Sequence, residues 1–158
     1  MGLLLCASGA LALAAGPDFT STWVLDALKS NVPMPHPGML GPFRDREITL
    51  EVTHTNDELQ ITRRAGEQST ELRYTLDGTD NINPSVGRHK GEVTSRARWD
   101  KDKLIIEGTQ ILTVQSQQFQ IGIREEWQLS AGGRVLTIAT TLATPQGNRT
   151  TLEVYNKK

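Results

Sequence analysis

The stretch FQIGIREEWQL, from Phe119 to Leu129, carries the pattern that decides the fold of this chain. Read with a period of two, it is an extended strand with an apolar row on one face: Phe119, Ile121, Ile123, Trp127 and Leu129. Glu125 falls in the middle of that row, whereas Arg124 and Glu126 fall on the opposite face. An isolated buried carboxylate costs roughly several kcal/mol unless it is paired, protonated or near water. Glu125 is therefore a candidate functional residue.

The same alternation recurs along most of the chain after residue 19, in short segments separated by breaks such as TND, AGE, DGT, AGG and TPQG. The expected strands are 19–26, 47–54, 58–64, 70–76, 92–99, 103–109, 111–115, 118–129, 134–143 and 150–155. Their short connections require antiparallel neighbours, because parallel strands need long crossovers. Residues 29–45, with four of the seven prolines, and residues 77–91 are expected to be long loops at the rim of a site or on the surface.

The expected fold class is therefore all-β. This number of antiparallel strands must curl or split into two sheets, because twist accumulates across a sheet. Sequential hairpins favour an up-and-down β-barrel of about eight to ten strands, which also removes exposed edges. A β-sandwich is the alternative. The interior of a small barrel holds either packed side chains or one small ligand.

The composition narrows the range of partners. The 158 residues include 17 basic and 18 acidic side chains, giving a net charge of −1, so no basic surface points to a nucleic acid or an anionic membrane. The three histidines lie far apart in the sequence, at positions 36, 54 and 89, and form no metal-ligand motif. DKDK, from Asp100, predicts a hairpin turn because it lacks the glycine and terminal glutamate of a calcium loop. We expect no metal and no cofactor.

Residues 1–15, MGLLLCASGALALAA, are uncharged and almost wholly apolar or small. The segment is too short to span a bilayer, and Ala12-Leu13-Ala14 offers the small residues that signal peptidase prefers. We expect a secretory signal over residues 1–15, although no lysine or arginine precedes its apolar run. A single domain would then occupy residues 16–158, exported to the periplasm or outside the cell and not inserted in the membrane. Cleavage would remove Cys6, the only cysteine, and with it any disulfide.

The segment FTSTWVLDALKSN resembles the first strand of lipocalin-like (calycin-type) domains, in which a Gly-x-Trp motif begins the barrel and its tryptophan closes the base. Trp23 would be that tryptophan, with Ser21 in the place of the usual glycine. The stretches TWVLDALKS, SRARWDKDKLIIEG and REEWQLSAGGRVLTI are similar to a family of exported, mostly uncharacterised bacterial proteins. The resemblance implies a fold and export from the cytoplasm, and it does not imply an activity.

Two further strands show an apolar inward row that ends in a polar residue. In EITLEVTH the row of Ile48, Leu50 and Val52 ends at His54, and in ELQITRR the row of Leu59 and Ile61 ends at Arg63. A tight turn joins these strands, so the sequence predicts that His54 and Arg63 lie close together at the mouth of a barrel. With Glu125 they would form a polar cluster that fixes the polar end of a ligand. A β-bulge that turns Glu125 outward, or a plain salt bridge at the rim, is the structural alternative.

The sequence thus supports three functional hypotheses. The first is an exported binding protein that holds a small, largely apolar ligand inside the barrel. Its predicted site comprises the cluster of Glu125, Arg63 and His54 and a wall of Trp23, Trp127, Ile123, Ile121, Ile61, Ile48 and Leu50. The second is a structural or interaction module with a filled barrel, and the third is an isomerase or cyclase with Glu125 as base and His54 or Arg63 as electrostatic partner. A small-residue row in VLTIATTLAT, residues 135–144, would leave room for a ligand if it faces inward.

Overall fold

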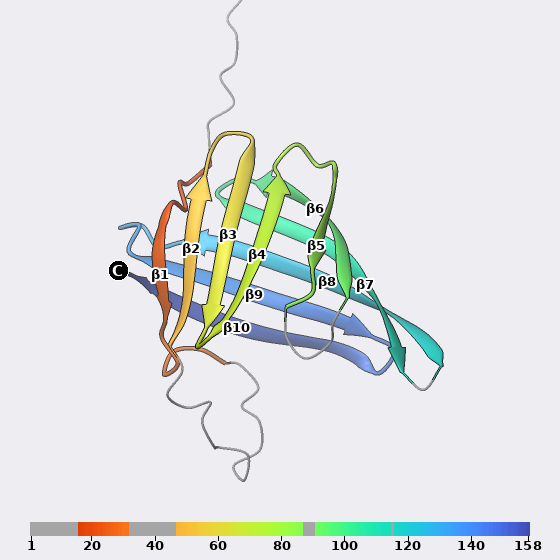
Figure 1. The fold of residues 1–158 in the computed structure, drawn as a ribbon. Coiled ribbons are helices and arrows are strands. Elements are labelled where there is room, and N and C mark those ends of the chain that lie inside the picture. Colours follow the sequence, from red (N-terminus) through yellow and green to blue (C-terminus); the bar gives the residue numbers. More distant parts are fainter. Residues whose placement is uncertain (1–15, 32–46, 87–90, 115) are drawn as a thin grey trace, which may run out of the picture.

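Ten antiparallel strands wind into one nearly closed barrel in the computed structural model, which describes residues 16–31, 47–86, 91–114 and 116–158 (Figure 1). The strands are β1 (Ser21–Leu25), β2 (Ile48–His54), β3 (Glu58–Ala65), β4 (Gln68–Thr75), β5 (Asp80–Pro84), β6 (Glu92–Asp100), β7 (Lys103–Val114), β8 (Gln117–Leu129), β9 (Val135–Thr144) and β10 (Gly147–Lys157). The described residues contain no helix long and apolar enough to cross a bilayer.

The topology is an up-and-down meander. Each strand pairs with its successor in the chain except at β4 and β5, and β1 pairs with β10, with Trp23 opposite Lys157. This arrangement confirms the expected antiparallel barrel of eight to ten strands, and the sandwich alternative is wrong. The pairing of β1 with β10, the first and last strands of the chain, joins the two parts of the meander into one curled sheet, so that only its β4 and β5 edges lack a ladder partner.

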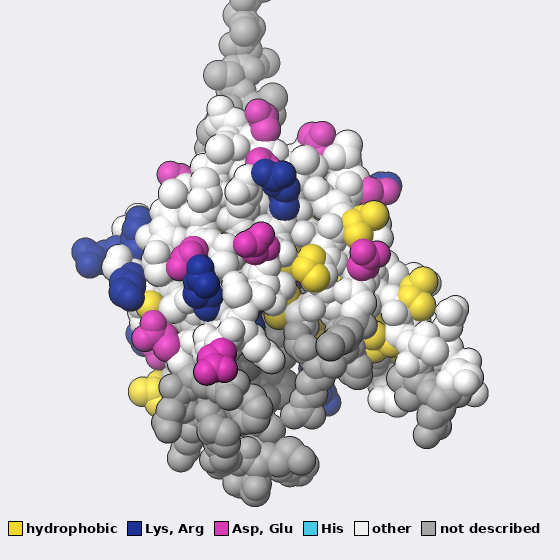
Figure 2. All heavy atoms as spheres, viewed as in Figure 1, with side chains coloured by type: hydrophobic (Ala, Val, Ile, Leu, Met, Phe, Trp, Pro, Cys, Tyr) yellow, Lys and Arg dark blue, Asp and Glu magenta, His cyan; other side chains and the backbone are white. Residues whose placement is uncertain are grey.

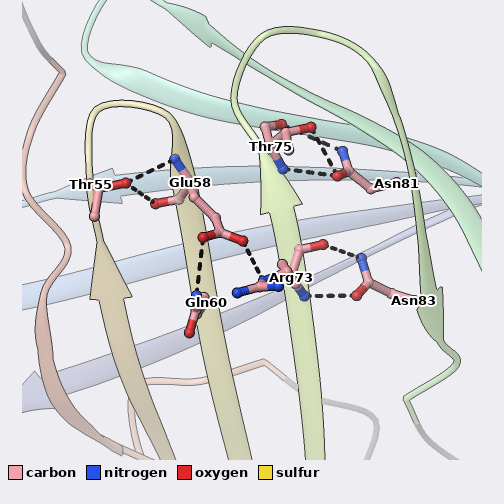
Figure 3. A network of polar contacts seen from close by, with 7 residues as sticks. All are labelled: Thr55, Glu58, Gln60, Arg73, Thr75, Asn81 and Asn83. Atoms are coloured by element: carbon pink, nitrogen blue, oxygen red, sulfur yellow. Dashed lines mark hydrogen bonds and ion pairs between the residues drawn. The ribbon is translucent and has the colours of Figure 1, made fainter.

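Two asparagine side chains bridge the seam between β4 and β5, where no backbone ladder forms (Figure 3). The backbone N–H of Arg73 donates to Asn83 Oδ1 at 2.7 Å, and Asn83 Nδ2 donates back to the Arg73 carbonyl at 2.8 Å. The N–H of Thr75 likewise donates to Asn81 Oδ1 at 2.8 Å. A carboxamide carries one acceptor and one donor group, as a peptide unit does, so each asparagine replaces a missing strand partner.

Aromatic side chains fill one end of the barrel, at the strand ends beside the β2–β3, β6–β7 and β8–β9 turns. The Phe19 ring stacks on Trp99 with centroids 5.7 Å apart and meets Trp127 edge-on at 5.8 Å. Aromatic pairs of this kind add roughly 0.5–1.5 kcal/mol beyond their buried area. Trp23 is fully buried, and its indole N–H donates to the Phe19 carbonyl at 2.9 Å. We call this packed region the closed end.

Two details of the predicted strands were wrong, and both involve polar side chains that point inward. Residues 77–91 were expected to be a loop, yet β5 lies within them with Asn81 and Asn83 inside and Ile82 67% exposed. The expected strands 103–109 and 111–115 are one strand, β7, and Gln110 between them is buried. An inverted or interrupted apolar pattern hides a strand, because the period-two signal assumes an apolar interior.

The outer face carries interspersed charges, and apolar side chains gather toward the side of β5 to β7 (Figure 2). Arg96 pairs with Asp80 at 2.6 Å, and Arg98 with Glu107 at 3.5 Å, as expected for a solvated face. The turn at Asp100 is the predicted hairpin, with Asp100 opposite Lys103. The predicted signal segment 1–15 with Cys6, most of the expected 29–45 loop with His36, and His89 lie outside the described residues.

Candidate ligand-binding cavity

A cavity of about 410 Å³ occupies the barrel interior beyond the closed end. It extends from Trp127, Tyr74 and Tyr155 toward the opposite end of the barrel, where Leu112, Ile121 and Leu142 lie near the β7–β8 and β9–β10 turns. Its apolar wall includes Leu50, Ile61, Leu72, Ile106, Ile123 and Ile138. The interior is therefore hollow over part of its length and filled over the rest.

Strand β8 carries the alternating row of side chains that contains Glu125. Ile121, Ile123, Glu125 and Trp127 all line the cavity, which confirms that Glu125 points inward without a bulge to turn it out. The adjacent Arg124 and Glu126 lie on the outer face, where they pair with each other at 3.2 Å. Uninterrupted pairing of β8 with β7 and β9 keeps the period of two through this segment.

Glu125 belongs to a small polar cluster within the apolar wall. Trp127 Nε1 donates to Glu125 Oε2 at 2.9 Å. Nearby, Arg63 Nη2 lies 3.8 Å from Glu153 Oε1, and the Tyr155 hydroxyl donates to Glu153 Oε2 at 3.0 Å. Strands β3, β8 and β10 thus bring three charged side chains to one cavity wall.

The cavity shifts the protonation of these groups. Burial raises the pKa of the Glu125 carboxyl; the Trp127 hydrogen bond opposes this rise, the charge of Glu153 adds to it, and Arg63 opposes it. Burial also raises the pKa of the Tyr74 phenol, with a further contribution from Glu125, and that of Tyr155, with a further contribution from Glu153. Both phenols are therefore neutral donors at physiological pH, and Glu125 is easier to protonate than an ordinary glutamate.

Polar groups also lie on the β6–β7 side of the cavity. Gln110 Nε2 donates to Ser85 Oγ at 2.8 Å. Ser95 is 4% exposed, and within the described part of the chain its hydroxyl makes no hydrogen bond. Ser95 packs against Gly108, where an added Cβ would lie 2.8 Å from the Ser95 Cβ. Because Gly108 has no Cβ, Ser95 packs directly against β7 at the cavity wall.

The structure brings six of the eight predicted site residues to the cavity: Glu125, Arg63, Trp127, Ile123, Ile121 and Ile61. Leu50, predicted for the same wall, is there too, whereas Ile48 packs against the buried core, opposite Ala65, and does not line the cavity. Trp23 lies in the closed end, consistent with the base-closing role that the resemblance implied and away from the cavity wall. That the six residues bind a ligand stays a prediction.

The predicted proximity of His54 and Arg63 is wrong. His54 is opposite Leu59 beside the β2–β3 turn, whereas Arg63 is opposite Leu50, four residues further along β3 and so about 13 Å away. Both residues face inward, but the turn places them at different depths. The His54 ring lies 5.7 Å from both Phe19 and Trp99, and its side chain is 8% exposed. Burial lowers the pKa of His54 against the opposing charge of Asp18, so this histidine is a neutral part of the closed end.

The sequence reasoning missed Glu153 and Tyr155. In the segment TLEVY the alternation does not show which side faces inward, because Val154 and Tyr155 are adjacent and both buried, and only Tyr155 lines the cavity.

The small-residue row of β9 faces outward. Ile138, Thr140 and Leu142 line the cavity, so Thr137, Ala139, Thr141 and Ala143 lie on the opposite face. In the described ranges, no three histidine, cysteine or acidic residues cluster closely enough to hold a metal ion.

Comparison with known proteins identifies the fold. No protein-family model matches the sequence, and no curated protein matches it. Solved structures do match: a fatty acid transporter, REP1-NXSQ, superposes with a TM-score of 0.58 at 13% identity, over 89% of this chain and 96% of that one. Zebrafish ileal bile acid-binding protein in complex with cholic acid gives a TM-score of 0.61 at 16% identity, over 89% and 98% of the two chains. A mutant of the fluorescent protein UnaG gives 0.55 at 16%, over 89% and 96%.

The chain therefore has the calycin-type β-barrel fold, shared by lipocalin-like and fatty-acid-binding proteins. At 11–16% identity these likenesses establish the fold alone. They agree with the fold that the resemblance of the first strand implied.

Proposed function

We propose that this protein binds a small, largely apolar molecule in the barrel interior. One observation carries the proposal: a cavity of about 410 Å³ with aliphatic walls and a few convergent polar groups. Ligand pockets in proteins typically measure roughly 300–1,000 Å³ and combine an apolar lining with a small number of placed polar side chains. When an apolar ligand covers the apolar wall, that surface is removed from water, and the free energy of the system falls.

The neighbours in fold support the same proposal. One is named a fatty acid transporter, and another is a bile acid-binding protein solved with cholic acid. Their names connect barrels of this fold with small, mainly apolar molecules. Because fold does not fix function, the neighbours raise the expectation for this chain without naming its ligand.

The two alternative functions fit the geometry less well. A filled structural module is disfavoured because the interior holds a cavity. The isomerase or cyclase hypothesis retains Glu125 and Arg63 but loses His54, which lies in the closed end. Export remains part of the proposal on the strength of residues 1–15, and amino-terminal sequencing of the protein recovered from an exported fraction tests it.

The test uses N-phenyl-1-naphthylamine, an apolar fluorophore that is uncharged at neutral pH and brightens in apolar surroundings. Two adjacent threonines of β10 provide a matched pair of variants, because Thr151 lines the cavity and Thr150 is exposed on the outer face. Thr151→Phe fills the cavity and should weaken fluorophore binding at least tenfold, whereas Thr150→Phe should leave it unchanged. Absence of saturable binding to the native protein, or an equal effect of both variants, would refute the proposal.

A further inference from the structure

The charges that line the cavity are unbalanced. Among the described residues, Arg63, Glu125 and Glu153 are the charged side chains on its wall. Arg63 is already paired with Glu153, which also accepts a hydrogen bond from the Tyr155 hydroxyl. The positive charge at this wall therefore already faces a carboxylate of the protein itself, at 3.8 Å.

Glu125 forms no salt bridge with the described residues, and Arg63 acts on it only through its more distant charge. Its one hydrogen bond to the described residues comes from the uncharged Trp127 indole and engages Oε2, leaving Oε1 without a donor. Thr140 is the cross-strand partner of Glu125 and also lines the cavity, so a second polar oxygen lies beside the carboxyl group. A carboxyl oxygen and a hydroxyl oxygen on neighbouring strands both accept hydrogen bonds.

We propose that the ligand carries a basic amine, whose ammonium group pairs with Glu125 while its apolar body fills the cavity. This inference rests on the proposed function and names the ligand class. An ammonium group offers three N–H donors and a second positive charge for the second of the two carboxylates on the wall. It would donate to Glu125 Oε1, with the Thr140 hydroxyl as a second acceptor.

A carboxylic acid fits the same wall poorly. Its carboxylate would either displace Glu153 from Arg63 or stand as a like charge near Glu125. While Glu125 is ionised, each arrangement leaves a desolvated negative charge without a cationic partner, which is costly inside a protein. The polar end of this cavity therefore favours a different ligand class from the acids that the fold neighbours are named for, fatty acid and cholic acid.

The release of protons on ligand binding provides a second test of the inference. Burial raises the pKa of the Glu125 carboxyl group, so it is easier to protonate in the empty cavity than an ordinary glutamate. When a protonated amine enters, the carboxyl ionises to form the ion pair, and its proton leaves to solvent. Amine binding should therefore release protons below the pKa of Glu125 in the empty protein, and amine affinity should rise with pH through that range. Tyr74 and Tyr155 stay neutral throughout, because their pKa values are raised.

The decisive experiment compares dodecylamine, 1-dodecanol and dodecanoate, which share one chain length, as displacers of N-phenyl-1-naphthylamine at neutral pH, low salt and submicellar concentration. We expect dodecylamine to bind at least tenfold more tightly than dodecanoate and several-fold more tightly than dodecanol. Glu125→Gln should remove the advantage of the amine over dodecanol and leave dodecanol binding within about twofold. Glu126→Gln, on the outer face of the same strand, should change none of the three affinities.

Dodecanoate binding as tightly as the amine, or an amine preference that survives Glu125→Gln, overturns the inference while the proposed function stands. Failure of the fluorophore to bind in a manner sensitive to Thr151→Phe overturns the proposed function itself. Titration calorimetry of the native protein in buffers of different ionisation enthalpy keeps the test open if a Glu125 variant fails to fold. Proton release with dodecylamine and none with dodecanol supports the inference, and equal release overturns it.

Discussion

Replacing Asn83 with leucine tests whether the asparagine amides hold the barrel shut at its seam. Leucine keeps the γ-branched shape of asparagine but removes both its hydrogen bonds to Arg73. Asn83 is 5% exposed, so the Arg73 N–H and carbonyl would be left in a largely buried setting. We expect the variant to fold less stably than the native protein.

The magnitude follows from the bonds that are lost. A typical protein hydrogen bond contributes about 1 kcal/mol net, so two account for about 2 kcal/mol, and stranding buried backbone groups adds roughly 1 kcal/mol. A total of about 2–3 kcal/mol corresponds to a fall in Tm of roughly 5–10 °C for a domain of this size. Ile82→Ala, at an exposed position between the two asparagines, is the control and should cost about 0.5 kcal/mol or less.

Equilibrium denaturation in urea measures the stability, and amide hydrogen exchange locates the change. In Asn83→Leu the amide of Arg73 should lose most of its protection, whereas that of Thr75, which donates to Asn81, should keep it. A stability within about 0.5 kcal/mol of the native protein, with Arg73 still protected, would refute the view that the amide replaces a strand partner.

Three further predictions address the cavity and the closed end. Burial raises the folded-state pKa of Glu125, so the ionised carboxylate should destabilise the fold. Glu125→Gln should therefore be more stable than the native protein above that pKa and equally stable below pH 4.5. Urea denaturation at several pH values shows whether the free energies of unfolding of the two proteins converge at low pH. Gly108→Ala should cost about 1–3 kcal/mol because its Cβ would lie 2.8 Å from the Ser95 Cβ, whereas Gly132→Ala, with open space around it, should cost little by thermal melting. His54→Ala should lower stability by about 2–3 kcal/mol and leave fluorophore affinity unchanged, and a loss of affinity in the folded protein would restore this histidine to the ligand site.

The sequence was informative wherever the interior is apolar. The alternation in 119–129 correctly predicted that Ile121, Ile123, Glu125 and Trp127 face inward, because an unbroken strand preserves its period, whereas Phe119 at the start of the row is exposed. It failed at β5 and at Gln110, where the barrel places amides inside. Those amides are stable there because Asn81 and Asn83 serve the β4 backbone and Gln110 serves Ser85, and none of these partners is visible in a single segment.

The sequence predicted most of the residues that line the cavity, but only part of their arrangement in space. The odd–even alternation along each strand showed that Arg63 and His54 face inward. It does not give their depth in the barrel, which depends on the register of β2 with β3. Glu153 escaped notice because its strand buries residues on both faces near its end. The pairing of Arg63 with Glu153 joins strands far apart in the chain, so it required the closed barrel.

The asparagine-bridged seam has a consequence for behaviour in concentrated solution. Strands β4 and β5 are the free edges of the sheet, and an open edge is a template on which another chain can add a strand. Here the backbone groups of Arg73 and Thr75 are already engaged by Asn83 and Asn81, and β5 ends in a proline, which has no N–H to offer. Two side chains thus cover the carboxyl-terminal part of the β4 edge against strand-by-strand aggregation, in place of a row of backbone pairing.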